Sequence, residues 1–173
     1  CFGLYILGDS FVTLWVGAEY ILPPVAFVIL IINTFISLTR TNDSFIAAYG
    51  LFQDVWAPVA EASLNLGFSI LLGHFFGLDG ILAGVMISLL VIVCGWKPYF
   101  LYSRGFKVSI WKYVFMLLNM LCLIFTSFLV STIILKYMDL SCPDICEWAQ
   151  TALKVLGVYV GVSMIVFLFD RNY

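Results

Sequence analysis

Five long apolar stretches occupy most of this chain, and they constrain its fold more than any other feature. They cover residues 21–38, 55–76, 81–101, 113–135 and 152–169. Each is close to the roughly 20 residues that a helix needs to cross the hydrocarbon core of a bilayer. The runs are continuous rather than alternating, which argues against the strands of a membrane barrel. We therefore predict an all-α fold, a polytopic transmembrane helical bundle of about five spans.

The composition agrees with a membrane protein and argues against several other classes. Hydrophobic residues make up 64% of the chain and charged residues 10%, with a mean hydropathy of +1.11. Soluble domains carry about 25% charged residues, so this chain could not cover a water-facing surface. There is one histidine, and we find no nucleophilic triad, phosphate-binding glycine loop or carboxylate cluster at ligand spacing. We expect no enzyme, no cofactor, no metal site and no nucleic-acid partner.

Charged residues predict the orientation. Threading five spans in alternation places most cations on one side: Arg40, Lys97, Arg104, Lys107, Lys112 and Arg171. Only Lys136 and Lys154 lie toward the other side. Positive residues stay cytoplasmic, so we expect a cytoplasmic C-terminus.

The start of the chain and its turns predict how the spans are grouped. Residues 2–16 are typical of the end of an interrupted apolar helix, and no signal peptide precedes them. We expect residues 1–173 to form a single transmembrane helical unit, the C-terminal part of a longer membrane protein. The short Gly77–Gly80 connection predicts that the second and third spans are antiparallel neighbours. Pro98 is expected to kink or end the third span.

Polar residues at the start of the second span are the first candidate site. The spacing of Asp54, Pro58, Glu61 and Asn65 places them on one stripe of a helix. Ionisable residues cost about 2.5–3.5 kcal/mol each inside a membrane and usually face a bundle interior or a water-filled cavity. One interpretation is a stripe that lines a cavity. The alternative places Asp54 in the headgroup layer and pairs Glu61 with a basic residue on another helix.

The first span carries a second group of polar residues in its cytoplasmic half, formed by Asn33, Thr34, Ser37 and Arg40. In a cavity they would offer hydrogen bonds to sugar hydroxyls and a cation to phosphate. Alternatively, the neutral residues hold helices together and Arg40 reaches to the interface.

Two cysteines flank Pro143 in the loop that we assign to the outside. Cys142 and Cys146 could form a local disulfide in an oxidising compartment, or remain two unpaired thiols.

Several segments resemble a known family of membrane transporters. They are Phe11–Tyr20 (FVTLWVGAEY), Asn65–Ile70, Gly77–Val85, and Arg104–Phe106 followed by Tyr113. They are similar to helix entries and packing regions of the bacterial polysaccharide (O-antigen) flippases, in the multidrug/oligosaccharidyl-lipid/polysaccharide exporter superfamily. Such proteins have about 12–14 helices in two pseudo-symmetric halves, so the resemblance implies that this chain holds most of the second half. Met86 departs from the family pattern, in which a Gly-Thr pair is common.

The resemblance implies a function as well as a fold. We expect transport of an undecaprenyl-diphosphate-linked oligosaccharide across the bacterial inner membrane by alternating access. Basic residues would neutralise the diphosphate, and a coupling cation could use Glu61 or Asp54. The expected partners are this substrate, membrane lipids and the missing N-terminal half of the protein. The alternatives are a drug/cation antiporter of the same superfamily or, with less support, a membrane-embedded polysaccharide polymerase or acyltransferase.

Overall fold

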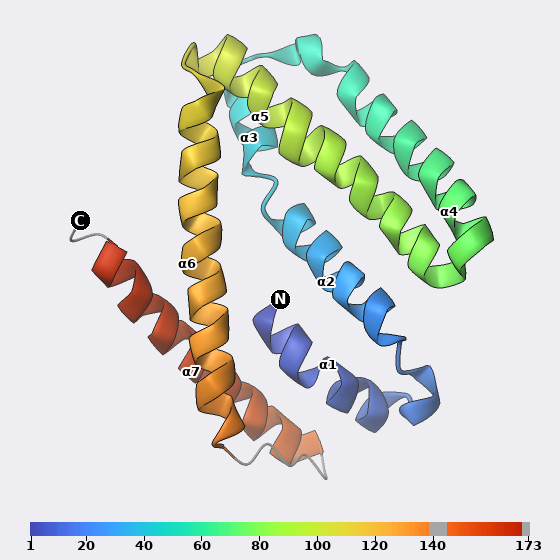
Figure 1. The fold of residues 1–173 in the computed structure, drawn as a ribbon, viewed down its shortest axis with the longest axis vertical. Helices are drawn as coiled ribbons and strands as arrows, with labels where there is room; N and C mark the ends of the chain where they lie inside the picture. The colour runs from blue at the N-terminus through green and yellow to red at the C-terminus, as the bar shows by residue number, and fades with distance from the viewer. Residues whose placement is uncertain (139–144, 171–173) are drawn as a thin grey trace. The chain divides into compact units, whose positions relative to one another are not determined.

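The computed structural model describes residues 1–138 and 145–170, with side chains up to residue 168 (Figure 1). The described residues are almost wholly helical and contain no strand, which confirms the predicted all-α class. The α-helices are α1 (Phe2–Trp15), α2 (Pro24–Leu38), α3 (Thr41–Ala48), α4 (Trp56–Leu89), α5 (Lys97–Phe100), α6 (Ile110–Lys136) and α7 (Ile145–Asp170). Short 3₁₀ turns form η1 (Ala18–Tyr20) and η2 (Phe52–Asp54), and π-helical turns form η3 (Leu90–Trp96) and η4 (Leu101–Phe106).

The long apolar helices are those of a membrane protein. Four helical segments of the described chain are long and apolar enough to cross a bilayer: Pro24–Ala48, Phe52–Phe106, Ile110–Lys136 and Ile145–Leu168. The second has 55 residues, and a straight helix of that length would extend about 80 Å. A hydrocarbon core is only about 30 Å thick. This segment therefore holds two spans, which correspond to the predicted runs at 55–76 and 81–101.

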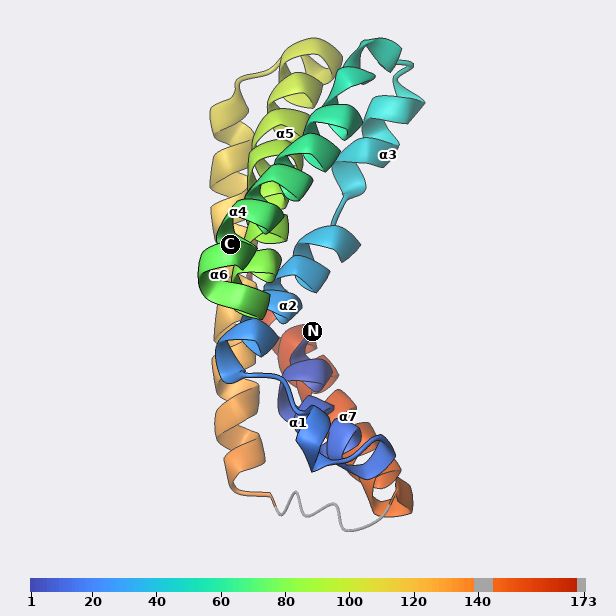
Figure 2. The same cartoon turned by 90° about the vertical axis from the view of Figure 1, so that its right-hand side faces the viewer.

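A glycine divides the long segment into a helical hairpin. Gly77 has φ 60° and ψ −132°, a backbone conformation that no helix contains and that side chains other than glycine rarely adopt. The chain reverses there, and the two arms of α4 run back along each other (Figures 1 and 2). The Ser69 hydroxyl on the first arm donates to the Ile81 carbonyl on the second, at 3.1 Å. The arms approach so closely at Gly84 that a Cβ there would overlap the backbone of Ser69. The predicted tight, antiparallel turn is present.

The second arm of the hairpin does not end at Pro98. Helix continues through η3, α5 and η4 to Phe106. A proline ring clashes with the carbonyl four residues before it and donates no hydrogen bond. The π-helical turns of η3 end at Trp96, two residues before Pro98, and widen the helix there, because each of their hydrogen bonds spans one residue more than in an α-helix. Of the kink or ending expected at Pro98, the ending is wrong, because the helix continues with a local change of helix type.

The helices form two compact units. One consists of Cys1 and Leu22–Val114, and the other of Phe2–Ile21 with the described residues from Phe115 onward. The expectation of a single transmembrane unit rested on the absence of any linker, and it stays a prediction.

Each unit has its own apolar core. In the unit of residues 22–114, α2 lies against the α4 hairpin (Figure 2), and Ile36 packs with Leu89 and Val93. A further cluster joins Ile46 of α3 to Phe100 and Leu101. In the other unit α1 lies along α7, with a core built from Phe2, Leu7, Leu135 and Val155.

Candidate functional site

Arg40, the first charged residue of the site, lies at the break between α2 and α3. The backbone of Arg40 has ψ 42°, so α2 ends and α3 begins in a new direction at this residue. The Thr39 hydroxyl donates to the carbonyl of Phe35 at 2.8 Å, which also accepts the Thr39 backbone N–H at 3.1 Å. Asp43 lies in the first turn of α3, where the helix dipole favours a negative charge. The break therefore places a cation and an anion side by side.

Arg40 connects α3 to the first arm of the hairpin. Its Nη1 and Nη2 donate to the two carboxylate oxygens of Glu61, at 2.9 Å and 2.7 Å. Its Nε donates to Asp43 Oδ2 at 3.1 Å. Paired, parallel hydrogen bonds of this kind are the strongest arrangement between a guanidinium and a carboxylate. The expected alternative for Glu61, a pair with a basic residue on another helix, is the geometry that the structure contains.

Lys97 extends the same set of contacts to α5. Its Nζ lies 3.2 Å from Asp43 Oδ1 and 3.0 Å from Asp54 Oδ2. The side chains of Lys97 and Asp54 are only 8% and 4% exposed. The other Asp54 oxygen, Oδ1, accepts a hydrogen bond of 2.6 Å from the Trp96 indole Nε1. Asp54 is thus almost completely enclosed, with Oδ1 in a hydrogen bond to Trp96 and Oδ2 in an ion pair with Lys97.

These five residues form one ion-pair network, which consists of Arg40, Asp43, Asp54, Glu61 and Lys97. With every group ionised, three carboxylates face two cations, which leaves a net charge of −1. The network is open at one end, where Arg40 and Asp43 are 33% and 34% exposed, and closed at the Lys97–Asp54 end. A buried ion pair contributes little net stability, but removing one partner costs about 3–5 kcal/mol. A contribution to stability alone therefore does not explain why these charged residues are present.

Three of the five predicted site residues meet in this network: Arg40, Asp54 and Glu61. The helical stripe expected from their spacing does not extend to Asp54, because this residue belongs to η2 and α4 begins only at Trp56. The sequence interpretation missed Asp43 as a member and took Lys97 only as a marker of sidedness. The available signal was a lysine inside an apolar run, since such a charge needs a partner.

The two predicted asparagines lie elsewhere, in contacts of the hairpin. Asn65 Oδ1 accepts from the Ser69 hydroxyl at 3.1 Å, within the first arm. Asn33 Nδ2 donates to the carbonyl of Leu82 at 3.0 Å and so connects α2 to the second arm. Both match the alternative interpretation, in which polar side chains hold membrane helices together.

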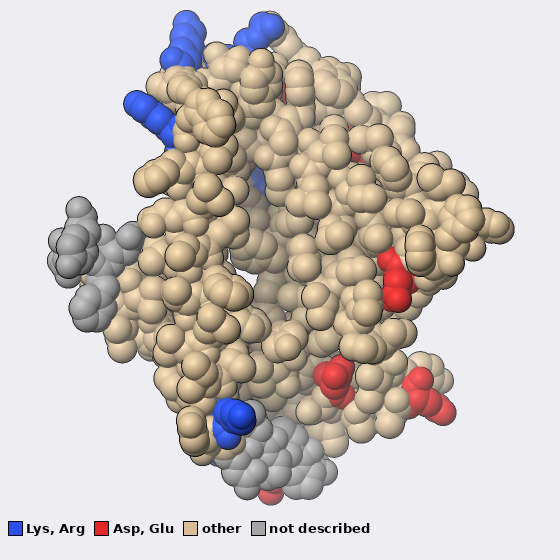
Figure 3. Space-filling model, in the orientation of Figure 1, with Lys and Arg blue, Asp and Glu red and all other residues tan. Residues whose placement is uncertain are grey.

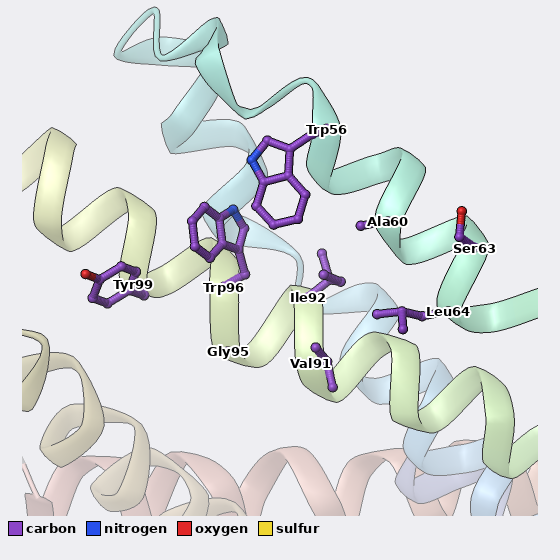
Figure 4. Close-up of a pocket in the computed structure, with 9 residues that line it drawn as sticks. All are labelled: Trp56, Ala60, Ser63, Leu64, Val91, Ile92, Gly95, Trp96 and Tyr99. Carbon is purple, nitrogen blue, oxygen red and sulfur yellow. The ribbon is translucent and has the colours of Figure 1, made fainter. Parts of the chain in front are cut away.

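An apolar groove adjoins the network. It is open, has a cavity volume of about 590 Å³, and runs between the first arm of the hairpin and the η3–α5 part of the second arm (Figure 4). The rings of Trp56 and Trp96 meet edge to face there, with centroids 4.7 Å apart. Trp96 belongs to both features, because its ring lines the groove while its Nε1 bonds Asp54. The residues around the groove are Trp56, Ala60, Ser63, Leu64, Val91, Ile92, Gly95, Trp96 and Tyr99.

The predicted disulfide falls partly on residues that are not described. Cys142 lies outside the described residues, and Cys146 is exposed at the start of α7. The pairing stays a prediction. Within the described ranges, no group of three or more His, Cys, Asp or Glu residues is placed to hold a metal ion.

Fold and site together define an all-α membrane protein whose α3, η2, α4 and α5 are joined by an ion-pair network that is buried at its Lys97–Asp54 end. No family model, no curated protein and no solved structure matches this chain.

Proposed function

We propose that this chain is part of a membrane transporter that carries a lipid-linked oligosaccharide across the bacterial inner membrane by alternating access. One observation supports transport most directly: five charged side chains share one network among helices that are otherwise apolar. Charges within membrane helices are costly, and they mark substrate or ion pathways. The choice of substrate rests on the resemblance of Phe11–Tyr20 and Gly77–Val85 to the polysaccharide flippases.

The open end of the network is suited to the polar head of such a substrate. Arg40 is one third exposed, and a guanidinium binds phosphate oxygens in the same bidentate way as it binds a carboxylate. A diphosphate would compete with Asp43 and Glu61 for this side chain. In this proposal, binding of the substrate exchanges one anionic partner of Arg40 for another.

The excess of one carboxylate supports coupling to a cation. With the network at net charge −1, uptake of one proton or one monovalent cation would make it neutral. A neutral site is cheaper to move through a low-dielectric interior than a charged one. Glu61 and Asp54 remain the proposed carriers.

The drug/cation antiporter is the second candidate, and two observations favour it. The network is negative, and the adjoining groove is apolar with three aromatic side chains, Trp56, Trp96 and Tyr99. Aromatic faces and a nearby carboxylate attract lipophilic cations. The flippase remains the leading proposal because the quoted segments resemble the polysaccharide flippases within that superfamily.

The test is leaflet-resolved detection of lipid-linked oligosaccharide in cells that lack the full-length gene. We expect substrate to accumulate on the cytoplasmic leaflet and surface polysaccharide to be lost. A normal distribution, with new sensitivity to cationic drugs, would refute the flippase proposal and support the antiporter.

Complementation of the deletion then tests the network. Glu61→Gln should fail to restore transport at normal expression, whereas Glu19→Gln, which changes an exposed carboxylate outside the network, should restore it. The charge swap Arg40→Glu with Glu61→Arg, combined with Asp43→Asn so that position 40 faces no second carboxylate, keeps an ion pair between the same two positions. If the pair is only structural, the swap restores transport; if Arg40 also binds substrate, the swap is stable but inactive.

A further inference from the structure

A basic surface lies where η4 turns into α6, outside the ion-pair network. Arg104, Lys107 and Lys112 occur within nine residues of one another, and all three are exposed. Figure 3 shows Lys and Arg side chains gathered at this end of the unit formed by residues 22–114. We call these three residues the basic surface.

Within the described ranges, no carboxylate forms an ion pair with the basic surface. The sequence has no Asp or Glu between Asp79 and Asp139. Among the described residues, the ion pairs involve other cations, Arg40 and Lys97. In the described part of the chain, Arg104 Nη1 makes a long contact of 3.4 Å to an uncharged partner, Gln53 Oε1. Three cations are thus available to an external anion.

Apolar side chains flank the same surface. Trp111 is 75% exposed and Val108 is 40% exposed, and both lie between Lys107 and Lys112. Exposed tryptophans at the ends of membrane helices are placed at the level of the lipid headgroups. The helices on either side of the turn, residues 78–106 and α6, are membrane-spanning by length and hydropathy. A turn between two membrane spans lies at the depth of lipid phosphates, and exposed apolar side chains stand beside the cations there.

We propose that the basic surface binds the phosphate groups of anionic phospholipids. Juxtamembrane Lys and Arg residues attract anionic headgroups with an affinity gain of about fivefold per cation. The apolar flank favours a lipid over a soluble phosphate, since a free anion would gain nothing from Trp111 and Val108. This inference rests on the membrane location of the helices and is independent of the proposed transport activity.

Native mass spectrometry of the purified protein in detergent micelles tests the proposal. The micelles contain equal amounts of phosphatidylglycerol and phosphatidylcholine, and the two bound lipids are counted separately. The triple variant Arg104→Gln, Lys107→Gln, Lys112→Gln should lose its preference for phosphatidylglycerol by on the order of 100-fold. The matched control Lys136→Gln with Lys154→Gln removes two exposed lysines outside the basic surface and should keep the preference.

Salt provides a second measurement that needs no variant. The preference of the wild-type protein for phosphatidylglycerol should fall sharply in 1 M salt, where the Debye length is about 3 Å. An equal preference in the triple variant and the wild type would overturn the proposal. So would a preference that persists unchanged at high salt, or one that the control variant loses to the same extent as the triple variant.

Discussion

Replacing Lys97 by methionine removes the cation that lies between two carboxylates of the ion-pair network. Methionine keeps much of the length and volume of the lysine side chain, so the main change is loss of charge. The variant leaves Asp54, which is 4% exposed, without the Nζ that lies 3.0 Å away. Asp43 loses a contact of 3.2 Å but keeps Arg40. The network then carries a net charge of −2, from three carboxylates and one cation.

The loss of stability expected for Lys97→Met depends on which of its two ion pairs is buried. Breaking an enclosed pair such as Lys97–Asp54 costs about 3–5 kcal/mol. The contact to Asp43 adds at most about 1 kcal/mol, because this carboxylate is one third exposed and solvent screens the interaction. Asp54→Asn should cost much less, about 1–2 kcal/mol, since the amide oxygen still accepts from Trp96 and the network becomes neutral. The double variant should recover most of the loss caused by Lys97→Met.

The measurement is the free energy of unfolding by sodium dodecyl sulfate titration in mixed micelles, followed by circular dichroism. Lys154→Met is the matched control, because Lys154 is exposed on α7 and has no ion pair among the described residues. The reasoning is refuted if Lys97→Met loses no more stability than the control. It is also refuted if Asp54→Asn costs as much as Lys97→Met.

Two further predictions follow from single contacts, and a third follows from the sequence. Gly84→Ala should lower the free energy of unfolding by about 1–3 kcal/mol, because its Cβ would overlap the opposite arm. Gly67→Ala should leave the free energy of unfolding unchanged, because a Cβ there meets no atom. Equal stability of the two variants would contradict this packing. Trp96→Phe should cost about 1.5–3 kcal/mol in the same titration, and an unchanged value would mean that the indole bond contributes nothing. If Cys142 and Cys146 are bridged, a variant lacking the other cysteines should react with maleimide only after reduction.

The spans could be predicted because hydrophobicity alone determines them. A run of about 20 apolar residues has few alternatives to a membrane helix, and the glycines at 77 and 80 predicted the reversal between two such runs. The structure contains that reversal at Gly77. The change of helix type before Pro98 could not be predicted, since a proline in a helix can be accommodated by a kink, an end or a π-helical turn.

The ion-pair network was only partly predictable, because its partners are distant in the sequence. Arg40 and Glu61 are 21 residues apart, and the Trp96–Asp54 bond spans 42 residues. The sequence showed that Glu61 needed a partner, but only the folded hairpin brings α5 next to α3. The spacing of Asp54 and Glu61 predicted that they share one face of a helix. They do belong to one network, but Asp54 lies in η2 and Glu61 in α4, and each binds a different cation.

The sharing of partners in the network is a property that alternating access would need. Arg40 contacts both Asp43 and Glu61, and Lys97 contacts both Asp43 and Asp54. Asp43 is therefore common to the two cations, and it lies on α3, a helix of only eight residues. A shift of α3 toward one cation would leave the other with a carboxylate still in place. Ion pairs would be exchanged without exposing an unpaired charge to the apolar interior, and the several kcal/mol that such a charge costs would be avoided.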